Sequence, residues 1–190
     1  MNPDQNRVLA KAQTLNHWTA QKLFYHVGKN FQRKWTVKRG EVYFVDLGDN
    51  IGSEENKLRP VVILQSNAYN FGSPVFTCAI ISTSAMTIPD IQVPIAGTYS
   101  YVDHKGIQKQ LSGTIDLGQI KTIGKERIIS KKICYLKAEM KDIDVKLFNA
   151  LGLSSVISAK DNTIKSLQGK VEYLKEEIDK LNSGKDSSSE

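Results

Sequence analysis

The 190-residue sequence has few cysteines and no long hydrophobic run. Two cysteines, Cys78 and Cys134, cannot build a disulfide framework or a four-ligand zinc site, so we expect both to be reduced thiols. The longest aliphatic run is residues 61–64. This is far below the roughly 18 apolar residues that a membrane span requires, and no signal-peptide segment follows the start. We therefore expect a soluble, cytoplasmic protein with no membrane partner.

The familiar metal, nucleophile and phosphate-loop motifs are also missing. The only histidines are His17, His26 and His104, and no H-E-x-x-H, C-x-x-C, G-x-S-x-G or G-x-x-x-x-G-K-[ST] pattern occurs. His17 and His26 are nine residues apart. This spacing places them on different sides of a helix, which argues against a two-histidine ribonuclease site. The sequence predicts no metal site and no cofactor.

Positive charge is concentrated at the N-terminus. The first 40 residues contain eight basic side chains and one acidic side chain, a net charge of +7, whereas the remaining 150 carry 18 basic and 19 acidic side chains. A basic segment beside a neutral body suggests a polyanionic partner, because neutralising phosphates releases counterions. The alternative is a solvated helix face that contributes only solubility.

Residues 1–37 are predicted to form a basic helical extension. Over residues 4–34, apolar side chains recur at spacings of three to five, as in an amphipathic helix. Asp4 can cap this helix after Pro3, and Gly28 favours a break. We expect the apolar stripe to cover the domain that follows. Its members are Val8, Ala12, Leu15, Trp18, Leu23, Val27 and Phe31.

Residues 38–153 change to short strands separated by turns. The absence of long helices between the strands favours a small antiparallel barrel over a parallel sheet. A short helix over 137–151, stopped by Gly152, closes this zone. The fold class is therefore α+β with a mainly β core. The predicted strands are 41–47, 61–64, 75–81, 91–95, 114–117 and 120–123.

Residues 154–182 have a heptad rhythm. β-Branched side chains at a positions and leucine at d positions are typical of a two-stranded coiled coil. A parallel dimer would pair Lys170 with Lys175, whereas an antiparallel one can pair Lys170 with Glu177. The alternative is a helix that packs on its own domain or on the N-terminal helix. Residues 183–190 are predicted to be a disordered tail. The heptad residues are Ile157, Ile164, Val171, Ile178, Leu167, Leu174 and Leu181.

Two polar groups stand at strand ends and could meet a phosphate. Arg59 ends a polar loop that begins at Gly48, and Pro60 keeps it out of the helical region at the strand entrance. An arginine there can bind a phosphate in bidentate fashion and stabilise a phosphorane-like transition state. Ser82 and Thr83 follow the strand 75–81, and a hydroxyl can donate to a non-bridging oxygen. Each group alone is more often structural.

Three ordered motifs together resemble the MazF/PemK family of toxin–antitoxin endoribonucleases. They are Arg-Gly-Glu-Val-Tyr-Phe-Val-Asp at 39–46, Gly-Ser-Glu at 52–54 and Leu-Arg-Pro-Val-Val-Ile-Leu at 58–64. The stretch 116–123 is similar to a second family motif of Gln, a basic residue and Ser/Thr. The resemblance covers residues 38–153.

The resemblance implies an SH3-like antiparallel β-barrel of the MazF/PemK/CcdB type, usually a homodimer, with a cognate antitoxin protein as partner. It also implies cleavage of single-stranded RNA without metal. In that reaction the 2′-hydroxyl attacks the adjacent phosphorus and leaves a 2′,3′-cyclic phosphate and a 5′-hydroxyl. The substrate supplies the nucleophile, so the protein needs only proton transfer and charge stabilisation.

The resemblance also implies roles for particular residues. Arg59 matches the family's catalytic arginine, which acts as proton donor or phosphate clamp. Ser82 stands where the family usually has a catalytic threonine, and Thr83 follows it, so either can be the working hydroxyl. Gly118 replaces a residue that is often acidic in the family. The expected RNA-binding positions are Ser53, Glu54, Gln119, Lys121 and Thr122.

Two other functions use the same barrel: a gyrase-inhibiting, DNA-associated toxin and a non-catalytic nucleic-acid-binding regulator. A gyrase inhibitor needs neither Arg59 nor the hydroxyl pair, and Ser82 in place of threonine is the sign of a non-catalytic regulator. The extensions before residue 38 and after residue 153 receive no role from the resemblance. We hypothesise that the basic helix adds RNA or ribosome affinity and that the heptad helix stabilises a dimer.

Overall fold

The computed structural model describes residues 3–27, 36–83, 86–103 and 105–186. The chain divides into two compact units, the first ending at Ala150 and the second beginning at Leu151. Each unit is described separately below.

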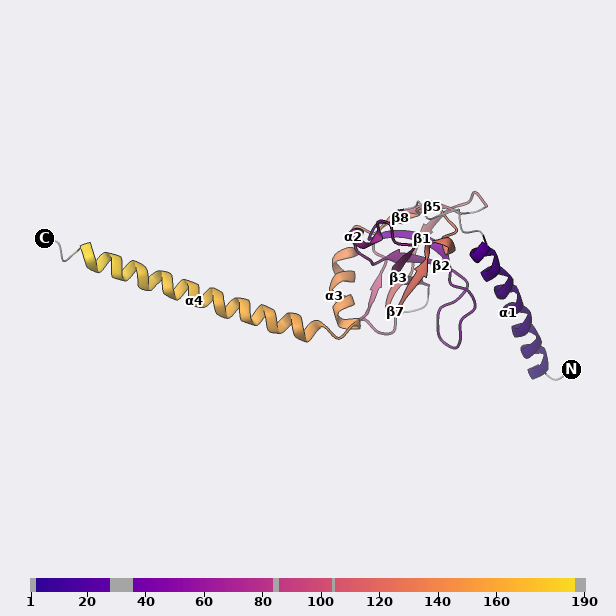
Figure 1. Cartoon of the computed structure of the whole chain (residues 1–190), viewed down its shortest axis with the longest axis horizontal. Helices are drawn as coiled ribbons and strands as arrows, with labels where there is room; N and C mark the ends of the chain where they lie inside the picture. Colours follow the sequence, from indigo (N-terminus) through magenta and orange to yellow (C-terminus); the bar gives the residue numbers. More distant parts are fainter. Residues whose placement is uncertain (1–2, 28–35, 84–85, 104, 187–190) are drawn as a thin grey trace. The chain divides into compact units, whose positions relative to one another are not determined.

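A six-stranded antiparallel sheet forms the centre of the first unit (Figure 1). Its strand order is β4-β7-β3-β2-β1-β8. A separate hairpin pairs β5 (Tyr99–Val102) with β6 (Gln108–Leu111). The predicted fold class, a mainly β, SH3-like antiparallel barrel with added terminal helices, is confirmed, and the sheet has the form of a half-barrel. The sheet strands are β1 (Glu41–Asp46), β2 (Leu58–Ile63), β3 (Val75–Ser82), β4 (Gln92–Pro94), β7 (Thr114–Gly124) and β8 (Cys134–Tyr135).

The predicted strands 114–117 and 120–123 are two parts of one long strand, β7. Its pairing with β3 shifts register between Ala79 and Ile80, so the two halves remain in one ladder across an irregularity. The sequence analysis did not predict the β5–β6 hairpin or β8. Three of the four residues of β6 are polar and exposed, and β8 has only two residues, so neither has a strong apolar pattern.

The core lies on both faces of the sheet, because alternate residues of a strand point to opposite sides. On β3, Phe76, Cys78 and Ile80 belong to one buried cluster, whereas Ala79 and Ile81 belong to the other. The second cluster is covered by α3 (Met140–Ala150), whose buried Ile143 packs into it. Between the strands lie the short helix α2 (Asn67–Asn70) and a 3₁₀ turn at Lys125–Arg127.

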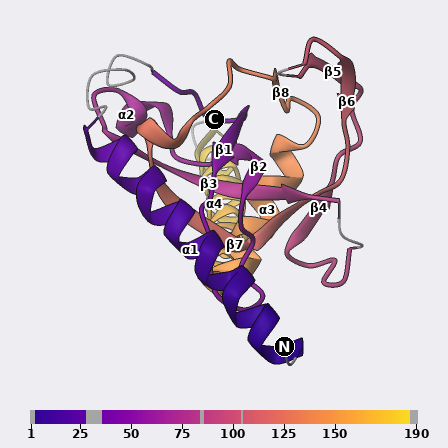
Figure 2. The same ribbon diagram turned by 90° about the vertical axis from the view of Figure 1, so that its right-hand side faces the viewer.

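The N-terminal helix α1 (Pro3–Val27) belongs to the first unit but is only partly covered by the rest of it. None of its residues is fully buried, and Val8, Leu23 and Val27 are 62–84% exposed. The expectation that the whole apolar stripe covers the domain is therefore wrong. Helix α1 is the indigo helix in Figure 2. Of its described residues, only Trp18, Gln21 and Tyr25 are half-buried. The predicted extension to residue 34 and the break at Gly28 lie outside the described residues.

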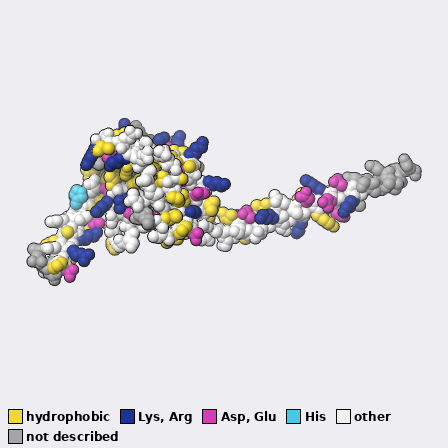
Figure 3. All heavy atoms as spheres, turned by 180° about the vertical axis from the view of Figure 1, so that it is seen from behind, with side chains coloured by type: hydrophobic (Ala, Val, Ile, Leu, Met, Phe, Trp, Pro, Cys, Tyr) yellow, Lys and Arg dark blue, Asp and Glu magenta, His cyan; other side chains and the backbone are white. Residues whose placement is uncertain are grey.

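The second unit contains one long helix, α4 (Ser154–Asp186). It includes the heptad segment and continues beyond residue 182, while residues 187–190 of the predicted tail lie outside the described part of the chain. The a and d side chains from Ile157 to Ile178 are 37–57% exposed. Hydrophobic side chains alternate with charged ones along this helix in Figure 3. No helix in the described residues is long and apolar enough to span a membrane.

Candidate functional site

Two neighbouring central strands bring Arg59 and Ser82 together at the same end of the sheet. Arg59 lies at the start of β2, and Ser82 is the last residue of β3. The antiparallel ladder between these strands places Val61 opposite Ile80. Continuing that register toward the strand ends places Arg59 opposite Ser82. The pair predicted from the sequence therefore lies together because β2 and β3 are adjacent and antiparallel.

Glu55 joins the two side chains. Its Oε2 accepts a hydrogen bond from Arg59 Nε at 2.8 Å, and its Oε1 accepts one from Ser82 Oγ at 2.9 Å. The Glu55 side chain is 18% exposed and the Arg59 side chain 41% exposed. The sequence analysis missed Glu55. Its four-residue separation from Arg59 was a usable signal, but only the folded loop turns the carboxylate toward Ser82.

Of the two candidate hydroxyls, the structure places Ser82 in this cluster. Thr83 follows the end of β3 and is exposed. Gly113 approaches the same strand end so closely that a Cβ there would lie 2.3 Å from the Ser82 carbonyl oxygen. With a φ of +123° as well, this position requires glycine. The close approach fixes the backbone from which the Ser82 side chain projects.

The strand β7 holds the loop that carries Glu55. Gln119 Oε1 accepts from the Glu55 backbone N–H at 2.8 Å, and Gln119 Nε2 donates to the Ser53 carbonyl at 3.3 Å. Lys121 Nζ lies 2.8 Å from a carboxylate oxygen of Glu54. Four of the five expected RNA-binding residues therefore contact one another across a hollow lined by the loop and β7.

Thr122, the fifth expected RNA-binding residue, faces another neighbour. Its Oγ1 lies 3.1 Å from Thr77 Oγ1 on β3, and its side chain is exposed. Gly118 lines the hollow beside Gln119 and provides no side chain there. The Gly118 backbone N–H donates to Asp116 Oδ1 at 2.9 Å, so a carboxylate from the same strand lies beside this position.

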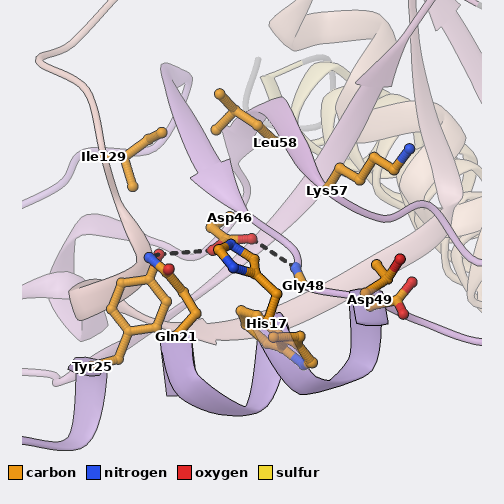
Figure 4. A pocket seen from close by; sticks show the side chains of 11 residues that line it. His17, Gln21, Tyr25, Asp46, Gly48, Asp49, Lys57, Leu58 and Ile129 are labelled. Carbon is orange, nitrogen blue, oxygen red and sulfur yellow. Dashed lines mark hydrogen bonds between the residues drawn. The ribbon is translucent and has the colours of Figure 1, made fainter. Parts of the chain in front are cut away.

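Helix α1 braces the base of the same loop (Figure 4). A Cβ at Gly48 would lie 2.3 Å from the Trp18 ring, so the indole rests directly on the loop backbone. Lys11 Nζ pairs with Asp49 Oδ1 at 2.7 Å, and the Tyr25 hydroxyl donates to Asp46 Oδ2 at 2.8 Å. Three independent contacts thus tie α1 to the segment that leads into the loop.

The histidines are not part of the Arg59 cluster. His17 and Asp46 both line the pocket between α1 and the loop base (Figure 4), and His26 lines a second hollow on α1. His104 lies outside the described residues. Among the described residues, no group of three histidine, cysteine or acidic side chains is arranged to hold a metal ion.

Both cysteines are free thiols, as expected. Burial raises the pKa of Cys78 and of Cys134 to about 12, so both are protonated at neutral pH. A protonated thiol is a poor nucleophile. Arg127 and Lys121 act to lower the pKa of Cys78, but burial outweighs both. The polar groups available for chemistry are therefore Arg59, Ser82 and the loop carboxylates.

Sequence comparison identifies the family. Residues 38–151 match the model of the PemK-like, MazF-like toxin of type II toxin–antitoxin systems. The chain belongs to this family. It is 37% identical over 118 residues to "Endoribonuclease EndoA" of Bacillus subtilis (strain 168), a match that covers 62% of this chain and 93% of that protein. The membership predicted from the three motifs is thus confirmed.

Solved structures of mycobacterial endoribonucleases are also similar to this PemK-like chain. One is 25% identical to this chain, and the match covers 63% of this chain and 95% of the mycobacterial one, with a TM-score of 0.49. Another, in complex with its cognate antitoxin, is 27% identical. That match covers 62% of this chain and 96% of the mycobacterial one, with a TM-score of 0.48. The family assignment rests on the sequence match, since both TM-scores are below 0.5. The family match includes neither α1 nor α4.

The brace formed by α1 predicts a measurable loss of stability when Trp18 is removed. Trp18→Ala should lower the free energy of unfolding by about 2 kcal/mol, because it removes a half-buried ring and its contact with Gly48. Leu23→Ala, on the same helix but 62% exposed, should change it by less than about 0.5 kcal/mol. Urea denaturation measures both. Equal losses for the two variants would mean that α1 does not brace the loop.

Proposed function

We propose that this toxin is an endoribonuclease that cleaves single-stranded RNA through attack by the substrate's own 2′-hydroxyl. The observation that carries the proposal is the convergence of Arg59 and Ser82 on one bridging carboxylate, in a chain of the PemK-like toxin family. Donors that hold two carboxylate oxygens can also hold two non-bridging oxygens of a phosphodiester.

In the proposed reaction, the 2′-oxygen forms a bond to phosphorus while the bond from phosphorus to the 5′-oxygen breaks. The 2′-hydroxyl loses its proton and the departing 5′-oxygen gains one, which leaves a 2′,3′-cyclic phosphate and a 5′-hydroxyl. Arg59 stabilises the charge that develops on the non-bridging oxygens, and Ser82 donates a hydrogen bond to one of them. We favour the clamp role for Arg59 over proton donation, because a guanidinium keeps its proton at neutral pH.

This mechanism requires no metal ion, since Arg59 supplies the positive charge at the phosphate. We further propose that Ser53, Glu54, Gln119, Lys121 and Thr122 contact RNA along the hollow beside β7. A cognate antitoxin protein covers the same surface, and the toxin acts in the cytoplasm on single-stranded RNA. The competing proposal of a gyrase-inhibiting or non-catalytic nucleic-acid-binding barrel gives no role to the Arg59–Ser82 pair.

The catalytic assignment predicts that purified protein cleaves a long RNA in excess EDTA. Arg59→Ala should lower the cleavage rate by about 100-fold or more, because the guanidinium supplies most of the transition-state stabilisation. Arg59→Lys should restore part of the rate, since it keeps the charge but loses the planar fork. Mass spectrometry of the products should show cyclic-phosphate ends.

The same assay separates the two hydroxyls and the competing functions. Ser82→Ala should slow cleavage more than Thr83→Ala, because only Ser82 contacts the carboxylate shared with Arg59. The reverse order would make Thr83 the working hydroxyl. Intact RNA with the unaltered protein would contradict the proposal and favour a non-catalytic barrel.

The charge on α1 predicts an electrostatic contribution to RNA binding. Arg7 and Lys22 carry positive charge on this helix, and Lys22 lies over the Trp18 ring at 5.3 Å. If both side chains contact phosphates, the double variant Arg7→Gln/Lys22→Gln should have a smaller slope of log affinity against log salt concentration, by about 1.4. Fluorescence anisotropy with single-stranded RNA measures the slope. The matched pair Lys160→Gln with Lys165→Gln on α4 should leave it unchanged, and equal slopes for all proteins would refute the contribution.

We also propose that the toxin is a homodimer and that α4 pairs with α4 of a second copy. The exposed a and d side chains of α4 have the composition of a two-stranded coiled coil. Pairing the helices antiparallel allows Lys170 to meet Glu177, whereas parallel pairing opposes Lys170 and Lys175. We therefore expect the antiparallel arrangement.

This pairing predicts that Leu174→Lys weakens self-association about tenfold or more, because each copy loses a buried leucine and gains a charge at the seam. Glu176 lies two residues further along the helix, at an outward f position. Glu176→Lys should therefore have little effect on self-association. Sedimentation equilibrium at several concentrations measures both dimer constants. Equal constants for the two variants would contradict pairing through α4.

A further inference from the structure

We propose that Glu55 occupies, in the RNA-free toxin, the position that the scissile phosphate takes during cleavage. RNA must then displace this carboxylate before Arg59 and Ser82 can act. This role of Glu55 rests on the proposed function. It makes Glu55, in the loop between β1 and β2, an internal competitor of the RNA phosphate.

The contacts of Glu55 are those expected of a bound phosphodiester. One carboxylate oxygen accepts from Arg59 Nε and the other from Ser82 Oγ, at 2.8 and 2.9 Å. A phosphodiester would present two non-bridging oxygens to the same two donors. Ser82 Oγ has a single proton to donate, and Arg59 Nε is already engaged by Glu55. Glu55 and the phosphate therefore exclude each other at this position.

The same loop arrangement engages the residues proposed to bind RNA. Gln119 holds the Glu55 backbone N–H and the Ser53 carbonyl, while Lys121 pairs with Glu54. Within the loop, Asn50 Nδ2 donates to the Glu55 carbonyl at 2.7 Å. Releasing Glu55 from Arg59 and Ser82, and Glu54 from Lys121, would remove a carboxylate from a guanidinium, a hydroxyl and an ammonium together. The two adjacent glutamates thus together block the side chains that would contact RNA.

The backbone of the loop is suited to opening about its base. Leu47 N–H donates to the Lys57 carbonyl, and Lys57 N–H donates to the Gly48 carbonyl, so the two ends are fixed. Lys57 has a φ of +61°, a left-handed conformation that costs a non-glycine residue about 1 kcal/mol. Gly52 lies at the tip with open space around it, and Ile51 is 87% exposed. The segment between these points has few packing contacts to break.

Glu55 could instead be a general base that removes the proton from the 2′-hydroxyl. The two roles have opposite kinetic consequences. A competitor raises KM, so removing it strengthens RNA binding and leaves kcat unchanged. A general base contributes about 100-fold or more to the chemical step, so removing it lowers kcat.

The test compares Glu55→Gln and Glu55→Ala with the unaltered protein. Cleavage sites are first mapped on a long RNA, and KM and kcat are then measured on an oligoribonucleotide containing one mapped site. Binding is measured separately with the same oligonucleotide carrying 2′-O-methyl groups, which cannot supply the nucleophile. We expect KM and Kd to fall about three- to tenfold, as for loss of a part-buried, charge-assisted pair, with kcat within about twofold.

Two controls isolate the local effect. Glu172→Gln removes the same charge from the exposed surface of α4 and should change Kd by less than about twofold. In an Arg59→Ala background, Glu55→Gln should give no gain beyond that of Glu172→Gln, because the shared donor is gone. If Glu55→Gln strengthens RNA binding equally with and without Arg59, the gain comes only from removing a negative charge, and the inference is overturned.

The remaining outcomes are also decisive. An unchanged or raised KM with a lower kcat would make Glu55 a catalytic base and overturn the inference while leaving the endoribonuclease intact. If the unaltered protein cleaves nothing, the proposed function fails. The 2′-O-methyl binding comparison would still show whether Glu55 competes with a phosphodiester.

Discussion

The site depends on one antiparallel ladder. Because β2 and β3 are adjacent, the residue that begins one strand lies beside the residue that ends the other, so a guanidinium and a hydroxyl meet without a dedicated scaffold. The buried side chains on both faces of β3 make this register costly to shift, since a slip of one residue would exchange the two faces. The geometry of Arg59 and Ser82 is therefore fixed by the core and not by the loops.

The loop between β1 and β2 is the adjustable part. It contributes two carboxylates, one against Arg59 and Ser82 and the other against Lys121. Helix α1, which the family match does not include, contacts the base of this loop through Trp18. Because Arg59 and Ser82 are fixed on the sheet and the acidic side chains are on a loop, the proposed displacement of Glu55 would separate access to the site from its chemistry.

The sequence was informative where burial determines structure. The runs at 41–47 and 75–81 became β1 and β3, and the sequence named Arg59 and Ser82, which the structure brings together. Glu55 was missed: its spacing from Arg59 was a usable signal, but its contact with Ser82 depends on the path of a loop that no periodic pattern describes. The stripe on α1 was misleading for the opposite reason. Its spacing is helical, but most of it faces outward, and periodicity alone does not show what covers an apolar face.

A crystal structure of the toxin with an uncleavable 2′-O-methyl RNA tests the central claim most directly. Two non-bridging oxygens of one phosphate should lie within hydrogen-bonding distance of Arg59 Nε and Ser82 Oγ, with the Glu55 carboxylate moved away from both. RNA bound elsewhere on the surface, with the Glu55 bridge intact, would contradict the account.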